Sequence, residues 1–156
     1  MQHPGQAKTY KVTISLVTWN SEAVVLACLR AVFEQTMTDF QIIVVDNASK
    51  DQTVARIKSE YPHVKVLRHP TNLGFARGHN LVMGLSKSPY MLILNPDVVL
   101  DKRYLEDILA VMEGNSTLGR AQGKLRRFSF ADGDDLRQLV PSDILDSTGL
   151  AGTKGR

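Results

Sequence analysis

The stretch that decides the fold is Tyr-Met-Leu-Ile-Leu-Asn-Pro-Asp-Val-Val-Leu, residues 90–100. An apolar run leads into a polar turn with one carboxylate, and a second apolar run follows. Such a short apolar run predicts a strand that is buried on both faces of a sheet. Pro96 ends the strand, because proline has no N–H to donate to a neighbour. Asp97 is therefore predicted at the carboxyl end of a buried strand, where ligands bind in open α/β sheets.

A carboxylate held at that edge can bind a hard divalent cation together with a phosphate group. An isolated Asn-Pro-Asp is more often an ordinary surface turn. The rest of the chain has to distinguish these two interpretations.

Strand and helix patterns alternate between residues 12 and 113. Strands are expected at 12–18, 41–45, 64–67 and 90–94. Helices are expected from the turn at 20–22 to about 36, from the turn at 46–49 to 61, out of the glycine-bearing loop at 70–80, and at about 101–112. This alternation is typical of parallel βαβ units, so the predicted fold class is α/β, with a mostly parallel sheet and helices on both faces.

Details of the helices also follow from the pattern. Asn20 or Ser21 is predicted to cap the first helix, and Ser49 the second. Glu22 would complement the dipole of the first helix. In the third helix, the buried side is expected to carry the apolar residues Leu81, Val82 and Leu85.

Length and composition place the chain among ordinary globular proteins. Its 156 residues allow one domain with a core, and 43% hydrophobic with 22% charged residues is typical of that class. The absence of a membrane-span pattern and of a signal-peptide pattern leads us to expect a cytoplasmic chain. The single cysteine, Cys28, lies at helical spacing among apolar residues and is predicted to be a small buried hydrophobe.

The charge balance limits the partners. A net charge of +3, from 19 Lys+Arg against 16 Asp+Glu, suits an anionic ligand or an acidic membrane surface without requiring either. No basic stripe is interleaved with aromatic residues, so a nucleic-acid partner is not expected. The four histidines show no metal-ligand spacing: His3, His63, His69 and His79.

Three polar turns follow three of the expected strands, at residues 18–20, 46–49 and 95–97. In a parallel sheet these turns share one edge, so their side chains should meet at one crevice. Trp19 offers a flat face on which a base can stack. Asp46 could accept a hydrogen bond from a base or a sugar, and Arg77 could reach a base carbonyl or a phosphate.

Each of these residues also has a structural explanation when it is taken alone. Trp19 could simply pack, Asp46 could cap a turn, and Arg77 could be a solvated helix residue. Their convergence on one edge is what favours a nucleotide site.

Other nucleotide-binding patterns fit less well. No Gly-x-Gly-x-x-Gly follows the first strand, and no Gly-Lys-Ser/Thr phosphate loop is present. A receiver-like phosphoacceptor would need an acidic pair after the first strand, where this chain has Thr18, Trp19 and Asn20.

Four ordered motifs resemble family 2 glycosyltransferases with the GT-A fold. They are Val-Thr-Trp-Asn-Ser-Glu (17–22), Ile-Val-Val-Asp-Asn-Ala-Ser-Lys-Asp (43–51), Asn-Leu-Gly-Phe-Ala-Arg-Gly-His-Asn (72–80) and Leu-Asn-Pro-Asp-Val (94–98). The similarity runs from about residue 12 to 149, and is greatest to the rhamnosyltransferase-like branch that builds bacterial surface polysaccharides.

The resemblance implies an inverting transfer from a nucleotide-diphospho-sugar to a glycan or lipid-linked acceptor. Trp19 would stack on the base, Asp46 and Arg77 would bind base and ribose, and Thr18 would shape the pocket. The same motifs assign further residues to the nucleotide-sugar site: Asn20, Glu22, Asn47, Asn80 and Asn95.

The resemblance also implies a metal. The turn at 95–97 matches the family's Asp-x-Asp motif in a degenerate form, with Asn95 in place of the first aspartate. Asp97 is then the single carboxylate for Mg²⁺ or Mn²⁺ bound to the diphosphate, so weaker metal binding is expected.

An inverting transfer needs a base for the acceptor hydroxyl. In the family this carboxylate lies further downstream, and the aspartates of residues 132–146 are not in a matching context. We therefore expect one domain, with a lead-in at 1–10, an α/β core at 12–119 and an incomplete acceptor-side region at 120–156. The general base is expected beyond Arg156.

Two classes of function stay open from the sequence. The first is a glycosyltransferase, or the donor-binding part of one, in the cytoplasm or at the inner face of the membrane. The second is a non-catalytic nucleotide-binding or partner-binding module. Exposed apolar surface and self-association are expected if part of a domain is missing.

Overall fold

The computed structural model describes residues 8–130, 139–147 and 152–153. Its elements, in chain order, are β1 (Val12–Thr18), α1 (Val25–Phe33), β2 (Phe40–Asn47), α2 (Thr53–Glu60), β3 (Lys65–His69), α3 (Gly74–Leu85), β4 (Tyr90–Leu94), α4 (Tyr104–Gly114), β5 (Leu118–Arg120), β6 (Leu125–Phe130), β7 (Leu139–Ser147) and β8 (Gly152–Thr153).

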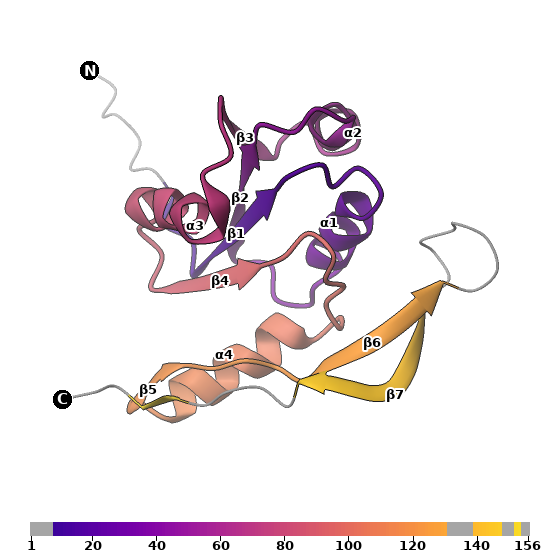
Figure 1. The fold of residues 1–156 in the computed structure, drawn as a ribbon. Coiled ribbons are helices and arrows are strands. Elements are labelled where there is room, and N and C mark those ends of the chain that lie inside the picture. Colours follow the sequence, from indigo (N-terminus) through magenta and orange to yellow (C-terminus); the bar gives the residue numbers. More distant parts are fainter. Residues whose placement is uncertain (1–7, 131–138, 148–151, 154–156) are drawn as a thin grey trace, which may run out of the picture. The chain divides into compact units, whose positions relative to one another are not determined.

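The main sheet has four parallel strands in the order β3-β2-β1-β4. Figure 1 shows α3 on one side of this sheet, and α2 with the start of α1 on the other. The predicted α/β fold class is confirmed.

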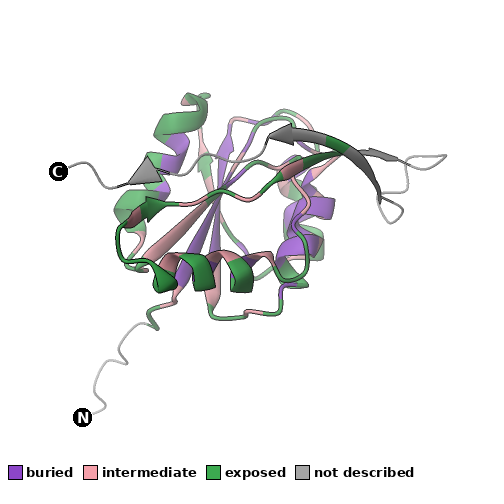
Figure 2. Cartoon of the chain, turned by 90° about the horizontal axis from the view of Figure 1, so that it is seen from below, coloured by how far each residue is buried: buried purple, intermediate pink, exposed green. Residues whose placement is uncertain are grey.

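The core of the sheet lies along β1 and β2. Both strands are apolar and β-branched, and Ile14, Leu16 and Val44 are completely buried. Figure 2 shows buried residues concentrated in these central strands. Burial from both sides is what fixes their register, because a slip of one residue would exchange the two faces.

The chain forms two compact units. One consists of residues up to Cys28 together with Thr38–Val98, and the other of Leu29–Met37 together with the chain from Val99 onward. The four-stranded sheet and every residue of the predicted nucleotide site belong to the first unit.

In the second unit, one buried glutamine joins the end of α1 to the start of α4. Gln35 Nε2 donates to the carbonyl oxygens of Ala31 (3.0 Å) and Asp101 (2.7 Å), while Gln35 Oε1 accepts from Leu105 N (2.9 Å). The same unit contains two antiparallel strand pairs, β5 with β8 and β6 with β7. The sequence pattern missed β7. Asp132-Gly133, a pair typical of a hairpin turn, lies outside the described residues.

The expectation that residues 90–94 are buried on both faces was wrong. β4 is the last strand of the described sheet, and Ile93 is 47% exposed. The reason is the position of α3, which packs on β1 and β2 and so leaves one face of β4 open.

The buried side of α3 was also only partly predicted. Val82 is completely buried, but Leu81 is 43% and Leu85 is 53% exposed. The helix packs instead through Gly78, His79 and Val82, which turns its leucines away from the sheet.

Close packing of α3 on β1 depends on Gly78 and His79. A Cβ at Gly78 would lie 2.9 Å from Val17 Cγ2, so only glycine allows this approach of helix to strand. One residue on, His79 Nδ1 lies 2.7 Å from Ser15 Oγ, and the imidazole packs edge-to-face with the Phe75 ring at a centroid distance of 4.4 Å. The packing of α3 on β1 therefore combines one close apolar contact with one buried hydrogen bond.

We expect Gly78→Ala to destabilise the fold by about 1–3 kcal/mol, because Val17 is β-branched and cannot rotate away freely. Gly84→Ala is the matched control, since a Cβ there meets nothing within 4 Å. It should stabilise the helix by up to about 1 kcal/mol. Urea unfolding of both variants measures the difference, and equal effects of the two would contradict the close approach.

The stability should depend on pH through His79. Burial lowers the pKa of His79 from 6.5, and Nε2 is buried without a hydrogen-bond partner in the described chain. The unfolded state therefore takes up a proton at a higher pH than the folded state does. Stability should be complete above about pH 6.5 and fall as the pH decreases toward the folded pKa. Urea midpoints across this range should vary less in His79→Gln than in the wild type; unchanged pH dependence would refute this role.

Candidate functional site

The three predicted turns lie on one edge of the sheet. β1 and β2 run in parallel with Thr18 opposite Asp46, and β1 and β4 run in parallel with Leu16 opposite Leu94. The residues that follow these strands therefore emerge at the same carboxyl edge, where α/β sheets bind ligands.

Asp46 is completely buried at this edge. Its Oδ1 accepts a hydrogen bond from Thr18 Oγ1 (3.3 Å) and its Oδ2 from Ser49 N (3.3 Å), with Arg68 Nε at 3.7 Å. The side chain has no exposed surface. Asp46 thus caps the turn after β2, in which Ala48 adopts a left-handed φ of 62°. A ligand can reach its carboxylate only if one of these neighbours moves.

Sequence reasoning missed Arg68. It is opposite Asp46 in the parallel pairing of β2 with β3, so its role depends on register rather than on a motif. Its side chain is 60% exposed, so water screens the charge of this ion pair.

Trp19 stands at the carboxyl end of β1 with 59% of its surface exposed. Its backbone is fixed nonetheless. Trp19 N donates to Ser21 Oγ (3.2 Å), which in turn donates to Trp19 O (3.3 Å). The indole is therefore an open flat surface on an anchored backbone, and it is the single tryptophan of the chain.

Asn20 and Glu22 bond to the neighbouring loop. Asn20 Oδ1 accepts from Lys50 N (2.8 Å), and Glu22 Oε2 accepts from Gln52 N (2.7 Å). Asn20 also has a left-handed φ of 48°. The structure therefore places both side chains in contacts between the β1–α1 and β2–α2 loops.

The predicted helix caps were wrong for the same reason. α1 begins at Val25 and α2 at Thr53, beyond the reach of the residues proposed as caps. Ser49 Oγ accepts from Asn20 N (2.9 Å) instead, because the two loops face each other.

Asn47 positions the start of α3. Its Nδ2 donates to Gly74 O (3.2 Å), and its Oδ1 accepts from Leu73 N (3.4 Å). Gly74 has a φ of 76°, which favours glycine. Asn47 itself is buried, so its role here is to hold the loop from which the next residues project.

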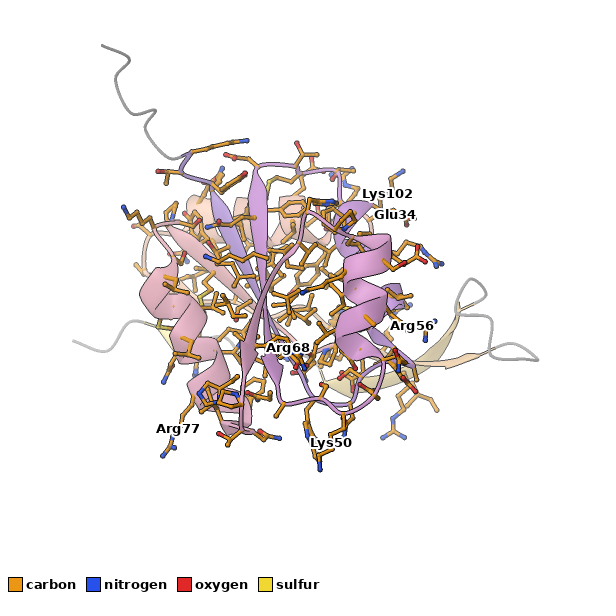
Figure 3. All side chains as sticks on the ribbon, turned by 90° about the horizontal axis from the view of Figure 1, so that it is seen from above. Glu34, Lys50, Arg56, Arg68, Arg77 and Lys102 are labelled. Carbon is orange, nitrogen blue, oxygen red and sulfur yellow. The ribbon has the colours of Figure 1, made fainter. Side chains whose placement is uncertain are left out.

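Arg77 and Asn80 project from α3 and are exposed. Figure 3 shows the side chains of Arg77 and Lys50 at the same end of the sheet. Lys50 lies in the loop after β2, so this end is the carboxyl edge. Two cationic side chains are thus available to an anion at that edge.

Asn95 and Asp97 lie exposed in the turn after β4. Asn95 O accepts hydrogen bonds from Val98 N (3.3 Å) and from Cys28 Sγ (3.5 Å), and these two bonds stabilise the turn. Burial, with a contribution from the charge of Asp97, raises the pKa of Cys28 to about 12. Cys28 is thus a buried, unreactive residue, as predicted.

The residues present fit a divalent cation that is shared with a ligand. The described part of the chain has no group of three or more His, Cys, Asp or Glu side chains that could hold a metal by themselves. Asp97 offers one exposed, hard oxygen ligand. Mg²⁺ in particular is commonly bound by one or two carboxylates, water and substrate phosphates, so one carboxylate suffices when a phosphate is bound.

Comparison with known proteins identifies the family. The profile of Glycosyl transferase family 2 matches residues 13–137, so the chain belongs to that family. It is 32% identical over 107 residues to an uncharacterised glycosyltransferase of Haemophilus influenzae, covering 69% of this chain and 36% of the relative. It is also 32% identical over 114 residues to the poly(ribitol-phosphate) beta-N-acetylglucosaminyltransferase TarP of Staphylococcus aureus, covering 69% and 35%.

Solved structures share the GT-A-like fold. The structure of S. aureus TarS 1–349 with UDP aligns with a TM-score of 0.63 at 23% identity, covering 79% of this chain and 37% of that one. A mannosyltransferase from Pyrobaculum calidifontis with GDP-Man and Mn²⁺ aligns with a TM-score of 0.66 at 21% identity, covering 77% and 36%. The chain therefore spans little more than a third of the length of these two solved chains.

A membrane-spanning helix is not found among the described residues, because none of their helices is both long and apolar enough.

Substitutions of Asp46 and of Arg68 should lower the stability of the fold by different amounts. Asp46→Ala should cost about 1–3 kcal/mol, because it leaves the buried donors of Thr18 and Ser49 unpaired. Arg68→Ala should cost less than about 1 kcal/mol, because the guanidinium is mostly in water. Urea unfolding measures both. A larger loss for Arg68→Ala than for Asp46→Ala would mean that the ion pair, rather than the turn hydrogen bonds, stabilises the buried carboxylate.

Proposed function

We propose that this chain binds the nucleotide-diphospho-sugar donor of an inverting glycosyltransferase. The observation that carries the proposal is the parallel pairing of β1 with β4, which brings exposed Trp19 and exposed Asp97 to the carboxyl ends of adjacent strands. One side chain suits a base and the other a metal-bound diphosphate.

The proposed roles follow from exposure. Trp19 stacks on the base, and Arg77 and Asn80 on α3 reach the ribose or the phosphates. Asp97 holds Mg²⁺ or Mn²⁺ together with the diphosphate, and this cation offsets the charge that develops on the leaving group. Asp46, with Thr18, shapes the floor of the pocket and contacts the ligand if Arg68 moves away.

The substrates are proposed from the relatives and the motifs. A TarS structure contains UDP-GlcNAc, and TarP is named as an N-acetylglucosaminyltransferase acting on poly(ribitol-phosphate). We propose a hexose or deoxyhexose donor, the latter because of the rhamnosyltransferase-like motifs. The proposed acceptor is a glycan or a lipid-linked precursor of a bacterial surface polysaccharide, reached from the cytoplasm at the inner face of the membrane.

Transfer also requires a base to take the proton of the acceptor hydroxyl. The proposal gives no residue of this chain that role. Donor binding is therefore the activity that the chain itself can be tested for.

Nucleotide binding should be visible in the fluorescence of Trp19, the one tryptophan. We expect UDP to quench its emission, because a stacked base contacts the indole directly, and Mn²⁺ to tighten binding. Asp97→Asn should abolish most of the gain from Mn²⁺, by about tenfold in Kd, while leaving metal-free binding in place. Calorimetry with Trp19→Ala should show weaker binding, since a base on an aromatic ring contributes about 1–3 kcal/mol.

Asp107→Asn is the control, because this exposed acid lies in α4, in the other unit of the chain. It should bind UDP with Mn²⁺ as the wild type does. The proposal fails if UDP, GDP, CDP and dTDP all leave the emission and the calorimetric heat unchanged at millimolar concentration with Mn²⁺.

A further inference from the structure

We propose that Asp51 is a positioning residue that, through the β2–α2 loop, fixes the backbone carrying Trp19. The inference rests on the proposed function, since it gives that function a rigid stacking surface. Asp51 is the last residue of the motif at 43–51, and its role follows from hydrogen bonds between the two loops.

Three consecutive backbone N–H groups after Trp19 donate to side-chain oxygens of the β2–α2 loop and of Thr53, the first residue of α2. Asn20 N donates to Ser49 Oγ (2.9 Å), Ser21 N to Thr53 Oγ1 (2.7 Å) and Glu22 N to Asp51 Oδ2 (3.0 Å). These three residues lie before α1, which starts only at Val25, so the acceptors of their N–H groups come from another element.

Asp51 organises the central member of this set as well. Its Oδ1 accepts from Thr53 Oγ1 (2.6 Å) and from Thr53 N (3.0 Å). Because the Thr53 hydroxyl hydrogen is directed at Asp51, the oxygen's lone pairs are left for Ser21 N. Asp51 therefore controls two of the three hydrogen bonds. It accepts the bond from Glu22 N directly, and it orients the completely buried Thr53 hydroxyl that accepts from Ser21 N.

The β2–α2 loop also donates hydrogen bonds to the β1–α1 loop. Asn20 Oδ1 and Glu22 Oε2 accept from Lys50 N and Gln52 N, and Arg56 donates to Glu22 O (2.7 Å). This reciprocal arrangement holds Asn20 in its left-handed conformation, which a free asparagine adopts only in a minority of cases. The backbone directly after Trp19 is therefore fixed from a neighbouring element.

The same contacts exclude another role for this loop. Successive backbone N–H groups that point together often form an anion-binding nest. Here side-chain oxygens already accept all three, so the β1–α1 loop is not available to the donor phosphates. The phosphates are left to Asp97 with its cation and to the cationic side chains on the other elements of the edge.

The charge state of Asp51 agrees with this role. Burial acts to raise the pKa of Asp51, but the hydrogen bonds from Thr53 and the Glu22 amide outweigh it, so the pKa is lowered. A carboxylate that stays ionised makes charge-assisted hydrogen bonds, which are stronger than those of a neutral group.

The test compares Asp51→Ala with Asp51→Asn, which keeps one acceptor oxygen. In the absence of nucleotide, Asp51→Ala should lower the fluorescence anisotropy of Trp19 and increase its quenching by iodide. It should raise the Kd for UDP with Mn²⁺ about fivefold to tenfold, and Asp51→Asn should restore part of both properties.

Val82→Ala separates positioning from a general loss of stability. Val82 belongs to α3 and is completely buried in the core cluster with Ile43 and Val45. It should lower the urea midpoint yet leave the anisotropy and the Kd at wild-type values. The inference is overturned if Asp51→Ala leaves Trp19 anisotropy unchanged, or if Val82→Ala alters it equally. If wild-type protein does not bind UDP, the proposed function fails, but the anisotropy comparison still decides the role of Asp51.

Discussion

The parallel pairing of β1 with both β2 and β4 is the constraint on which the site depends. β1 has a neighbour on each side, and nearly all of its residues are buried. Its register with β2 and β4 is therefore held by burial on two faces and hydrogen bonds on two edges. Because all three strands point the same way, the turns that follow them cannot separate. The indole of Trp19, the turn capped by Asp46 and the exposed carboxylate of Asp97 therefore lie at the same edge of the sheet.

Polar side chains at this edge divide by burial into two kinds. Asp46, Asn47 and Thr53 are buried, and each accepts a hydrogen bond from a backbone N–H group, Asp46 within its own turn and the other two from a neighbouring loop. Trp19 and Asp97 are exposed and leave their functional surface free. This division follows from the cost of burying an unpaired polar group, which forces enclosed residues to find protein partners. Residues that share one sequence motif therefore have different physical tasks.

The alternation of apolar runs and helical periods was sufficient to predict the fold class and the edge on which the turns meet. It could not predict which face α3 would present, because a single glycine, Gly78, decides how the helix approaches Val17. Nor could it predict the contacts of Arg68 or Asp51, which depend on the partners that register and loop packing bring close. The helix caps failed for a related reason. Asn20 and Ser49 are good caps by propensity, but the facing loop offered each of them a nearer partner.

A motif with one carboxylate changes how the charge of a diphosphate must be balanced. Asparagine at position 95 contributes a dipole where a second aspartate would contribute a charge, and its backbone carbonyl is already used by Val98 and Cys28. A cation held by Asp97 alone is bound mainly through the phosphates themselves, so metal and nucleotide should bind as a pair. Lys50 and Arg77, at the same end of the sheet, add positive charge that does not depend on the metal. In the proposed site, a rigid indole would set the position of the donor before the cation completes the site, so the loop that holds Trp19 would be as important as the acid proposed to bind the metal.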